Sequence, residues 1–524
     1  MCYKRKPGEE ILLSALGPKS WGKIGAAGVR YKFQRIRDPL HNLIEFPGDE
    51  FHDTMWRVIQ TPEFQRLRRI KQLGFSELVY PGANHTRFAH SVGVFHTARK
   101  LIDVIRKYLD DKDWQDTKKN AALAAALVHD LGHGPYSHAF EEVGRRLNLP
   151  MANHEKVTDS LVRTGEVGTV LNNWVSGFAS DVADMIAKTG RASIYGAVVS
   201  SQFDADRLDY MQRDRLMTGT HHGAIDLQWL ISNLEVGTVP HGVDQEKVGE
   251  IETFVLGPKA LLAAETYLLS LFQLYATVYL HKATRGAEKL FTELLARLFR
   301  LTLDSSVEKT GLSDRHPLIR FAKSPENLEC ALALDDSVIS GALFTMTEAK
   351  DSLVSDFSKR LRDRRLYKCI DVREGLAEGM RSASRKKASA RKTGKNDESK
   401  TRKPPKSEVD NEKFGVELDR MCKEVEGRLA NWGGQHQEDI PRILLDKTER
   451  SMYKPFEESK GPLEQIMIKL GNEHSKPVDV ASVSQVIKAI APFKVQRVYI
   501  KDGDEKAKQE IQQILDEEIK KCRF

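Results

Sequence analysis

Cysteine is scarce in this sequence, and its few cysteines form no recognisable pattern. The five residues are odd in number, include no CxxC pair and are spread over the 524 positions at 2, 330, 369, 422 and 522. Neither a disulfide framework nor a zinc knuckle is therefore expected, and a reducing cytoplasm is the predicted location. Residues 1–10 are charged and lack an apolar segment, so a secretory signal is not expected either.

Long hydrophobic runs are also missing. The most apolar stretch, Phe254 to Leu280, contains Lys259, Glu265 and Thr266. It is too polar for the roughly 20 apolar residues that a membrane-spanning helix needs, so we expect a buried helix and no membrane partner. With 40% hydrophobic and 30% charged residues, the composition is typical of a folded globular chain.

Positive charge is in excess, but it is concentrated in one segment. The segment from Arg381 to Lys406 contains eleven Lys or Arg residues and only two acidic residues, Asp397 and Glu398. Its net charge is therefore +9, whereas that of the whole chain is +7. The rest of the chain therefore carries about −2 and has little general attraction for polyanions. This segment has no aromatic residue on which bases could stack. It is interpreted as a flexible solvated linker or, alternatively, as a nucleic-acid-binding arm.

Hydrophobic periodicity predicts a mainly α fold with a smaller mixed α/β C-terminal portion. Asp38-Pro39 supplies turn chemistry for a strand or hairpin over Tyr31 to Phe46, and apolar spacings of three and four run from Phe51 to about Ser305. Later segments alternate between helical and strand-like patterns, with a strand-like run at 365–372. The predicted regions are an N-terminal segment 1–37, a helical body 38–305, a mixed region 306–374, a disordered basic insert 375–408 and an α/β region 409–524.

The sequence His129-Asp-Leu-Gly-His-Gly-Pro-Tyr-Ser-His138 has the sharpest chemical signal. Adjacent His129 and Asp130 offer a divalent metal one imidazole and one carboxylate, and the glycines and proline that follow turn the chain back over it. His133 and His138 are thereby brought to the same place. A His-Asp dipeptide alone is common and usually has no function, so its context decides.

Three further features supply that context, although each has an ordinary interpretation. His90 precedes an amphipathic helix and could be a capping residue, and His154 opens another helix. Asp206 lies on a helix whose carboxylates could simply form a solvated face with nearby arginines. Four ordinary interpretations together are improbable, and a metal site is favoured.

These motifs resemble the HD-domain deoxynucleoside triphosphate triphosphohydrolases. The resemblance extends with gaps from about Asp38 to Val372 and is densest in four runs: 38–41, 61–74, 80–93 and 129–138. It implies an HD-domain helical catalytic core that hydrolyses a dNTP to deoxynucleoside and inorganic triphosphate. It also implies that His90, His129, Asp130 and Asp206 bind the metal. This donor set suits Mn, Fe, Mg, Zn, Ni or Co.

The resemblance also assigns catalytic and substrate-binding residues. Histidines whose pKa lies near working pH move protons in this chemistry, and the implied catalytic residues are His133, His138, Glu141 and His154. The implied substrate contacts are Gln72 and Leu73 at the deoxyribose, Arg87, Arg207 and Asp214 at the triphosphate and sugar, and Tyr210 and Tyr279, which close over the nucleotide. Lys282 matches the same covering helix. A family arginine aligns near Leu271 and a family glutamine becomes Leu280, so the base preference stays open.

Some relatives are activated by nucleotides at subunit interfaces. Gln65, Arg68, Arg364 and Lys368 match parts of that regulatory site, which implies a homo-oligomer, a tetramer or hexamer, with a nucleotide activator. The carboxylate that reads guanine in those relatives is Gln60 here, which argues against the same guanine specificity. A solvated helix face is an equally good interpretation of these basic residues.

Two alternatives to the triphosphohydrolase remain. The first is another HD-superfamily enzyme, a nucleotidase, phosphodiesterase or nuclease, although Gln72, Arg87 and Tyr210 favour a triphosphate. The second is a catalytically idle nucleotide- or nucleic-acid-binding protein that uses the basic insert. The complete set of metal-ligand and catalytic positions argues against it.

Overall fold

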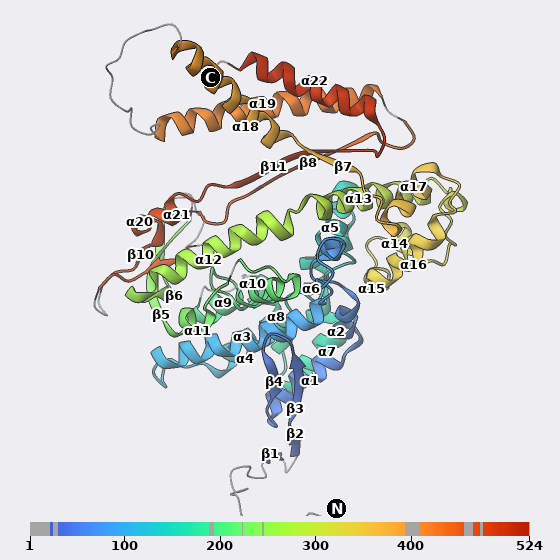
Figure 1. Cartoon of the computed structure of the whole chain (residues 1–524). Helices are drawn as coiled ribbons and strands as arrows, with labels where there is room; N and C mark the ends of the chain where they lie inside the picture. The colour runs from blue at the N-terminus through green and yellow to red at the C-terminus, as the bar shows by residue number, and fades with distance from the viewer. Residues whose placement is uncertain are drawn as a thin grey trace, which may run out of the picture.

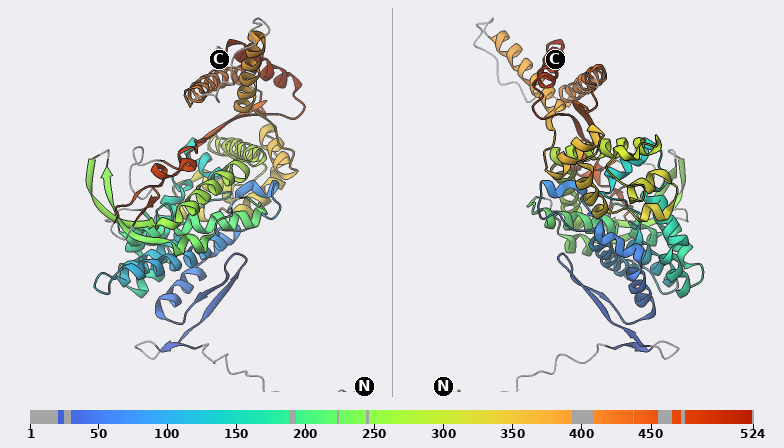
Figure 2. Two further views of the ribbon diagram at one scale, coloured as in Figure 1. Left: turned by 60° about the vertical axis from the view of Figure 1, so that its left-hand side comes forward. Right: turned by 90° about the vertical axis from the view of Figure 1, so that its right-hand side faces the viewer.

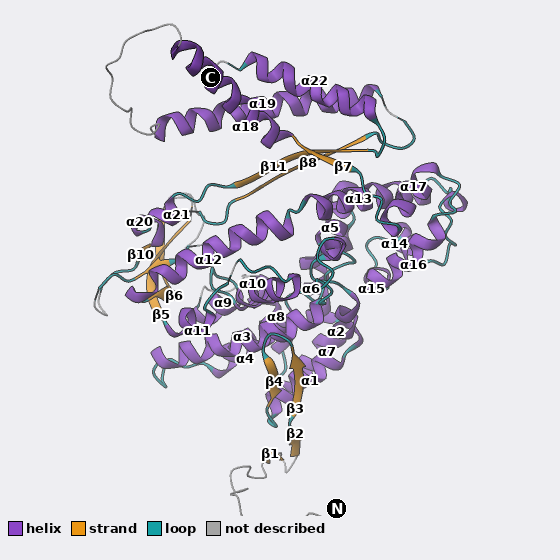
Figure 3. Cartoon of the chain, viewed as in Figure 1, coloured by secondary structure: helices purple, strands orange, loops and turns teal. Residues whose placement is uncertain are grey.

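A computed structural model of the chain describes residues 21–24, 30–187, 193–222, 224–243, 246–392, 408–436, 438–454, 465–471 and 475–522. Helices dominate it, and the strands form four small sheets of two to four strands each (Figure 3). The predicted fold class, mainly α with a smaller α/β portion, is therefore confirmed.

Two antiparallel strand pairs open the described chain. Strands β1 (Trp21–Ile24) and β2 (Arg30–Lys32) form the first pair, and β3 (Gln34–Asp38) and β4 (Asn42–Phe46) form the second. At the β3–β4 turn, the Asp38 carboxylate accepts hydrogen bonds from the backbone N–H groups of Leu40 and His41, both at 2.9 Å. This confirms the hairpin that the sequence predicts over 31–46.

A bundle of helices follows and forms the body of the molecule (Figure 1). Most of these helices begin at an Asp, Asn, Ser or Thr whose side chain caps the first turn. Their bounds are α1 Glu50–Gln60, α2 Pro62–Arg66, α3 Arg87–Tyr108, α4 Asp116–Val128, α5 His138–Leu147, α6 His154–Thr164, α7 Glu166–Trp174, α8 Phe178–Ala187, α9 Ile194–Val199, α10 Ala205–Thr218 and α11 Leu227–Ser232.

The expectation of an all-helical region from 51 to about 305 is wrong at one long hairpin. Strands β5 (Leu234–Val243) and β6 (Glu246–Leu256) pair antiparallel from Leu234↔Leu256 outward. Phe254 and Leu256 are buried in the core of the body, and Ile251 and Val255 are buried with Val239 and Met467. Successive side chains of β6 thus alternate between two buried faces, a strand pattern within a mainly helical region. Tertiary pairing with a later strand, β9 (Met467–Ile468), completes the sheet in the order β10-β9-β6-β5.

The apolar stretch after this hairpin is two helices separated by a break. Helix α12 (Leu261–Leu274) continues into a π-helical turn at Tyr275–Tyr279, and α13 (Lys282–Leu303) begins after it. Pro258–Tyr279 is, among the described residues, the one helical segment long and apolar enough to cross a membrane. One face of α12 is buried in the core through Tyr267, Leu268 and Leu271, while Leu262 and Leu269 are exposed.

The C-terminal half forms a small helical cluster and an upper layer (Figures 1 and 2). The cluster packs on α13 and consists of α14 Pro317–Lys323, α15 Leu328–Leu332, α16 Asp336–Met346 and α17 Ser352–Arg362. The upper layer holds β7 Lys368–Asp371, α18 Val372–Lys392, α19 Glu408–Gln435, β8 Ile443–Arg450, β11 Phe493–Ile500 and α22 Glu505–Lys521, with β11 between β7 and β8. Between β8 and β11 lie β9, β10 Val478–Asp479, α20 Val480–Val483 and α21 Gln485–Lys488.

The disorder expected from residue 375 onward is wrong for residues 375–392, which belong to α18. Leu376, Ala377 and Met380 are buried in a core shared with α19 and α22. The first turns of α18 therefore have an apolar face, which is hard to recognise in the sequence because basic residues dominate the segment that follows. Residues 393–407 of the predicted insert lie outside the described residues.

The region after β8 returns to the helical body. Met452, Tyr453, Ile466 and Ile468 are buried in the same hydrophobic core as the helices of the body. The Tyr453 hydroxyl donates a 2.7 Å hydrogen bond to Asp479. The described residues between β8 and β11 are therefore part of the helical body and hold the end of β8 against it.

Candidate active site

Three helices place imidazole and carboxylate groups at one point. His90 lies in the first turn of α3, His129 ends α4, and Asp206 lies in the first turn of α10. Each offers one donor atom, and the three atoms lie within 4.8 Å of one another. His90 Nε2 is 2.9 Å from Asp206 Oδ1, which is 3.6 Å from His129 Nε2. Helix packing thus brings together three of the four predicted donors, of which His90 and Asp206 are 116 positions apart in the sequence.

The local chemistry at His129 fits a metal ligand. Its Nδ1 lies 3.0 Å from the carbonyl of Ala126, which makes this nitrogen the donor and leaves Nε2 as a lone-pair acceptor. Nε2 is buried and has no hydrogen-bond partner in the described chain. A buried unsatisfied nitrogen costs free energy unless a ligand takes it up. Asp130, the fourth predicted ligand, lies 3.4 Å from His129 Nε2 and 3.7 Å from His90 Nε2.

A buried ionic network orients His90. Its Nδ1 is 2.9 Å from Asp209 Oδ2, and the other oxygen of Asp209 is 2.7 Å from His41 Nε2. Arg213 donates to Asp209 on one side and to Asp38 on the other. A Cβ at position 93 of α3 would lie 2.2 Å from both Arg213 and Asp209, so glycine there permits the close packing. Sequence analysis missed this network, which couples α3, α10 and the β3–β4 hairpin.

The histidines and aspartates of this cluster stabilise one another's charged forms. Burial lowers the pKa of His90, but the hydrogen bonds and charges of Asp206 and Asp209 outweigh it and raise that pKa to about 10. Burial raises the pKa of Asp206, yet His129 and His90 pull it well below its usual range. Metal ligands must be ionised carboxylates and neutral imidazoles, so a divalent cation bound here would replace the proton that these carboxylates hold on His90.

A second cluster, formed by His133, His138, Glu141 and His154, adjoins the first. The Glu141 carboxylate accepts hydrogen bonds from Nδ1 of His138, at 3.0 Å, and from Nδ1 of His154. His133 stacks on His154 with ring centroids 4.1 Å apart, and its Nε2 is 3.2 Å from Asp130. The structure therefore brings all four predicted catalytic residues together and links them to the metal-ligand group.

The loop between α4 and α5 is shaped by close packing. A Cβ at Gly132 would lie 2.2 Å from the carbonyl oxygen of His154, so only glycine lets α6 approach the loop. Tyr136 and Ser137 both have left-handed backbone conformations, with φ of 53° and 54°. Such conformations cost free energy at non-glycine residues and concentrate at functional sites. They carry His138 to the pocket, where its side chain is 76% exposed.

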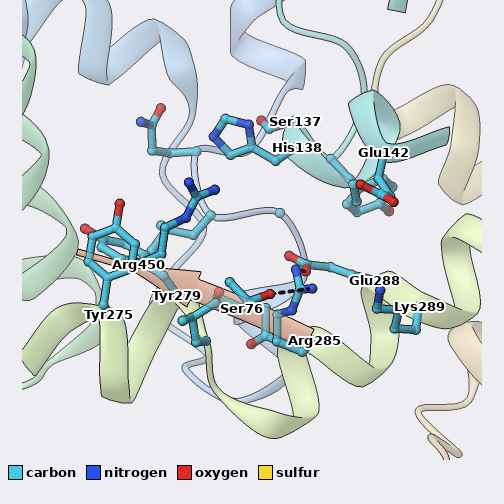
Figure 4. A pocket seen from close by; sticks show the side chains of 18 of the residues that line it. Ser76, Ser137, His138, Glu142, Tyr275, Tyr279, Arg285, Glu288, Lys289 and Arg450 are labelled. Carbon is cyan, nitrogen blue, oxygen red and sulfur yellow. Dashed lines mark hydrogen bonds and ion pairs between the residues drawn. The ribbon is translucent and has the colours of Figure 1, made fainter. Parts of the chain in front are cut away.

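A pocket of about 650 Å³ lies next to the second cluster and is lined by His138 of that cluster (Figure 4). Arg87 links the pocket to the predicted metal ligands. It lines the pocket, and its guanidinium donates hydrogen bonds to the Asp130 carboxylate and, at 2.9 Å, to Ser137 Oγ. Six of the seven predicted substrate-binding residues line this pocket: Gln72, Leu73, Arg87, Tyr210, Asp214 and Tyr279. Leu280, which aligns with a family glutamine, lines it as well.

Hydrogen bonds hold several of the side chains that line this pocket in place. The Tyr279 hydroxyl donates to Asp214 Oδ2 at 2.7 Å, and His85 Nε2 lies 2.8 Å from the other oxygen of Asp214. The Tyr210 and Tyr279 rings are 6.2 Å apart and nearly perpendicular. These contacts make one wall of the pocket rigid, as selective recognition of a ligand requires.

Arg207 is the predicted substrate residue that lies elsewhere. It donates to the side chain of Gln202 at 2.8 Å and lines a second, smaller pocket of about 220 Å³. Leu271 lines this second pocket too, and Tyr210 and Tyr275 line both. The two pockets therefore lie on either side of these two tyrosines.

Sequence analysis missed a set of polar residues that line the pockets. Arg285, Glu288 and Lys289 project from α13 (Figure 4), and residues 447–450 come from β8. The spacing of Arg285 and Lys289 places them on one helix face, but helix spacing alone does not distinguish a pocket wall from a solvated surface. The contribution of β8 has no sequence signal, because it depends on long-range strand pairing.

The four predicted regulatory residues line neither pocket. Arg68 stacks over the Phe88 ring at 3.5 Å and donates to Gln65. Arg364, in a left-handed conformation, donates to the backbone carbonyl of Leu78 at 2.8 Å, and Lys368 is exposed on β7. Their place outside the pockets is compatible with a regulatory site, and that role stays a prediction.

Comparison with known proteins agrees with this geometry. The HD domain family matches residues 87–211, the segment from α3 to α10 that carries the donor set. YwfO, an uncharacterized protein of Bacillus subtilis, is 35% identical over 340 residues, which cover 64% of this chain and 71% of YwfO. The mouse deoxynucleoside triphosphate triphosphohydrolase SAMHD1 is 27% identical over 73% of this chain and 60% of its own length.

The fold also has a counterpart among solved structures. A phosphohydrolase from Bacteroides thetaiotaomicron matches with a TM-score of 0.63 and 24% identity, covering 90% of this chain and 100% of the other. At that identity the likeness concerns the fold alone. The HD match over the donor-bearing helices, together with the extended similarity to YwfO, shows that the chain belongs to the HD-domain phosphohydrolase family.

Proposed function

We propose that this protein is a metal-dependent dNTP triphosphohydrolase, which converts a dNTP and water to deoxynucleoside and inorganic triphosphate. One observation carries the proposal: Arg87 lines a nucleotide-sized pocket and also binds Asp130 of the donor group. A phosphate group held at Arg87 would lie beside the metal ligands. The similarity to proteins named deoxynucleoside triphosphate triphosphohydrolase, in mouse and human, supports this substrate class.

The donor set determines the first part of the chemistry. A divalent cation held by His90, His129, Asp130 and Asp206 would polarise a phosphoryl oxygen and orient water. Asp209 keeps the His90 ring oriented through Nδ1 and leaves Nε2 directed at the donor group.

Proton transfer falls to the second cluster. Glu141 holds Nδ1 of both His138 and His154, which leaves the Nε2 atoms of these rings free to accept or donate a proton. Burial raises the pKa of Glu141, but the hydrogen bonds from His138 and His154 hold it well below its usual range. Glu141 therefore stays ionised and supports the charged form of either histidine when it takes a proton. His138, exposed to the pocket, is positioned to protonate the leaving oxygen of the nucleoside.

The pocket wall suits a deoxynucleotide. Gln72 and Leu73 are adjacent on the chain and line the same pocket as Tyr210 and Tyr279. Asp214 holds the Tyr279 hydroxyl and His85, so this wall cannot easily widen. A rigid wall at the sugar discriminates against an added 2′-hydroxyl.

Product analysis by mass spectrometry tests the proposal. The purified protein is incubated with each dNTP alone, with each NTP and with a mixture of all four dNTPs, with added Mn²⁺ or Mg²⁺. We expect deoxynucleoside plus triphosphate, and much slower turnover of NTPs. Release of monophosphate or diphosphate would indicate another HD-type phosphohydrolase, and equal rates on dNTP and NTP would rule out recognition of the sugar by Gln72 and Tyr210.

A further inference from the structure

Most positive side chains that line the two pockets are already paired with carboxylates. An anionic ligand must compete with an existing ion pair at each of these residues. The pairs are Arg87 with Asp130, Arg145 with Glu142, Arg285 and Lys289 with Asp446, Lys447 with Glu426, and Arg207 with Asp204.

Two positive residues differ from the rest. Arg450 lines the larger pocket and Lys454 lines the smaller one. Within the described ranges, neither side chain forms an ion pair or donates a hydrogen bond. Both side chains are exposed. They are the cations that an anionic ligand can recruit without first breaking an ion pair.

The backbone between these two residues is firmly held. Arg450 is the last residue of β8 and pairs with Phe493 of β11 in an antiparallel ladder that extends to Ile443↔Ile500. Met452 and Tyr453, between the two cations, are buried in the core of the body. Arg450 and Lys454 therefore project from a fixed support, which reduces the entropy that they would lose on binding a ligand.

Their location is close to the nucleotide-facing residues. Figure 4 shows Arg450 beside Tyr275 and Tyr279, at the end of the pocket opposite Lys289. Tyr210 and Tyr275 separate the larger pocket from the smaller one, so Arg450 and Lys454 flank the same two tyrosines. Arg207 lies in the smaller pocket with Lys454, while Leu271 there contributes no charge.

We propose that Arg450 and Lys454, on the C-terminal segment that crosses the active site, bind the polyphosphate of the substrate. The inference deepens the proposed function and rests on it for the identity of the substrate. The physical reason is that a polyphosphate carries several negative charges. Cations that have no carboxylate partner among the described residues, held on a fixed backbone, give charge-assisted hydrogen bonds without the cost of a broken ion pair. The C-terminal region would thereby complete the active site.

The test is calorimetric binding of inorganic triphosphate to the full-length protein with Mn²⁺ present. In R450Q and K454Q the affinity for triphosphate should fall about tenfold each, the usual loss for one charge-assisted hydrogen bond. Binding of the four deoxynucleosides should change less than twofold. R450K should recover part of the lost affinity, because it keeps the charge but not the two-pronged geometry.

A matched control is K488Q, which removes an exposed lysine of the same C-terminal region that lines neither pocket. It should leave triphosphate binding unchanged. Unchanged affinity in both R450Q and K454Q, or an equal loss for triphosphate and deoxynucleosides, would overturn the proposal.

The binding assay also separates this proposal from the proposed function. If the wild-type protein binds triphosphate through Arg450 and Lys454 but releases none from dNTPs, the polyphosphate site stands and the triphosphohydrolase assignment fails. If it releases triphosphate from dNTPs and the variants bind as the wild type does, the assignment stands and this inference fails.

Discussion

At the scale of single residues, the most informative atom is Nε2 of His129. It is buried without a hydrogen bond, while Nδ1 of the same ring is satisfied by the chain's own backbone. Folding has therefore fixed the ring with one nitrogen facing His90 and Asp206, and the unmet bonding capacity of that nitrogen is what a metal ion would use.

The variants His129→Ala and Asp206→Ala should abolish turnover while leaving the fold largely intact, because each removes a donor atom from the cluster. Metal content measured by mass spectrometry should fall in parallel, with circular dichroism unchanged. Asp116→Ala, which removes an exposed carboxylate at the start of α4, is the control. Full activity in both ligand variants would refute the metal assignment.

Glu141→Gln should lower kcat by roughly 10²–10⁴-fold, the usual contribution of general acid–base catalysis, and leave KM nearly unchanged. The amide cannot support the charge on His138 and His154 that the carboxylate supports. Metal content should stay at the wild-type level, which distinguishes this variant from the ligand variants. Glu155→Gln, an exposed neighbour on α6, is the control, and wild-type kcat in Glu141→Gln would exclude the catalytic role.

His96 should make the protein sensitive to acid. Burial, with the charges of Lys100 and His41, lowers its pKa to about 3. In the unfolded state the His96 side chain has its ordinary pKa of about 6.5. Between about pH 3 and 6.5 the unfolded state therefore binds more protons than the folded state. Stability should therefore fall as pH falls below about 6.5. Urea unfolding midpoints at pH 7, 6 and 5 should decline less steeply in His96→Gln than in the wild type, and parallel declines would contradict the prediction.

At the scale of elements, the buried network of Asp38, His41, His90, Asp209 and Arg213 joins α3, α10 and the β3–β4 hairpin. Arg213 and Asp209 are fully buried, and Arg213 reaches two carboxylates from one guanidinium. Charges buried this deeply are tolerated only when all their partners are present. The network fixes the helix that carries His90 against the helix that carries Asp206.

Asp209→Asn should therefore destabilise the fold by about 3–5 kcal/mol, the usual cost of breaking a buried ion pair. Metal affinity should drop about 10–100-fold, because His90 loses the partner of its Nδ1. Urea unfolding and a metal titration measure the two effects. Arg57→Met breaks an exposed pair with Asp53 and should cost less than about 1 kcal/mol. A similarly small cost in Asp209→Asn would show that the network does not orient the site.

At the scale of the whole molecule, the chain after β8 returns to the helical body and supplies part of the pocket wall. Strand β9 joins the β5–β6 hairpin through Leu256↔Ile468, and β8 brings residues 447–450 to the pocket. Catalytic and C-terminal parts thus share one site. A ligand that contacts both parts would couple them through these shared contacts.

If Arg68, Arg364 and Lys368 form a nucleotide-binding regulatory interface, a mixture of dNTPs should be turned over faster than each dNTP alone. The same mixture should increase the oligomer mass, measured by light scattering. In Lys368→Ala the activation should weaken while the product pattern stays the same, because this residue lies outside both pockets. Equal rates in mixtures and with single dNTPs, at constant mass, would exclude this type of regulation.

Much of the fold and of the donor set follows from the sequence alone. Helical periodicity predicts the helices of the body, and Asp38-Pro39 predicts the first hairpin. The run from His129 to His138 predicts a metal site, because metal ligation requires particular side chains in a recognisable local order. The same local information identifies Asp206 and His90 only when all the motifs are considered together.

Other features depended on tertiary structure. The β5–β6 hairpin is stabilised by pairing with β9, and the first turns of α18 by burial against α19 and α22, so neither is evident from local pattern. The Asp209 network and the contribution of β8 to the pocket join residues far apart in sequence. A basic residue such as Arg450 looks like any solvated charge until strand pairing places it beside Tyr275 and Tyr279. Chain composition determined which chemistry is available, and long-range packing decided which side chains take part in it.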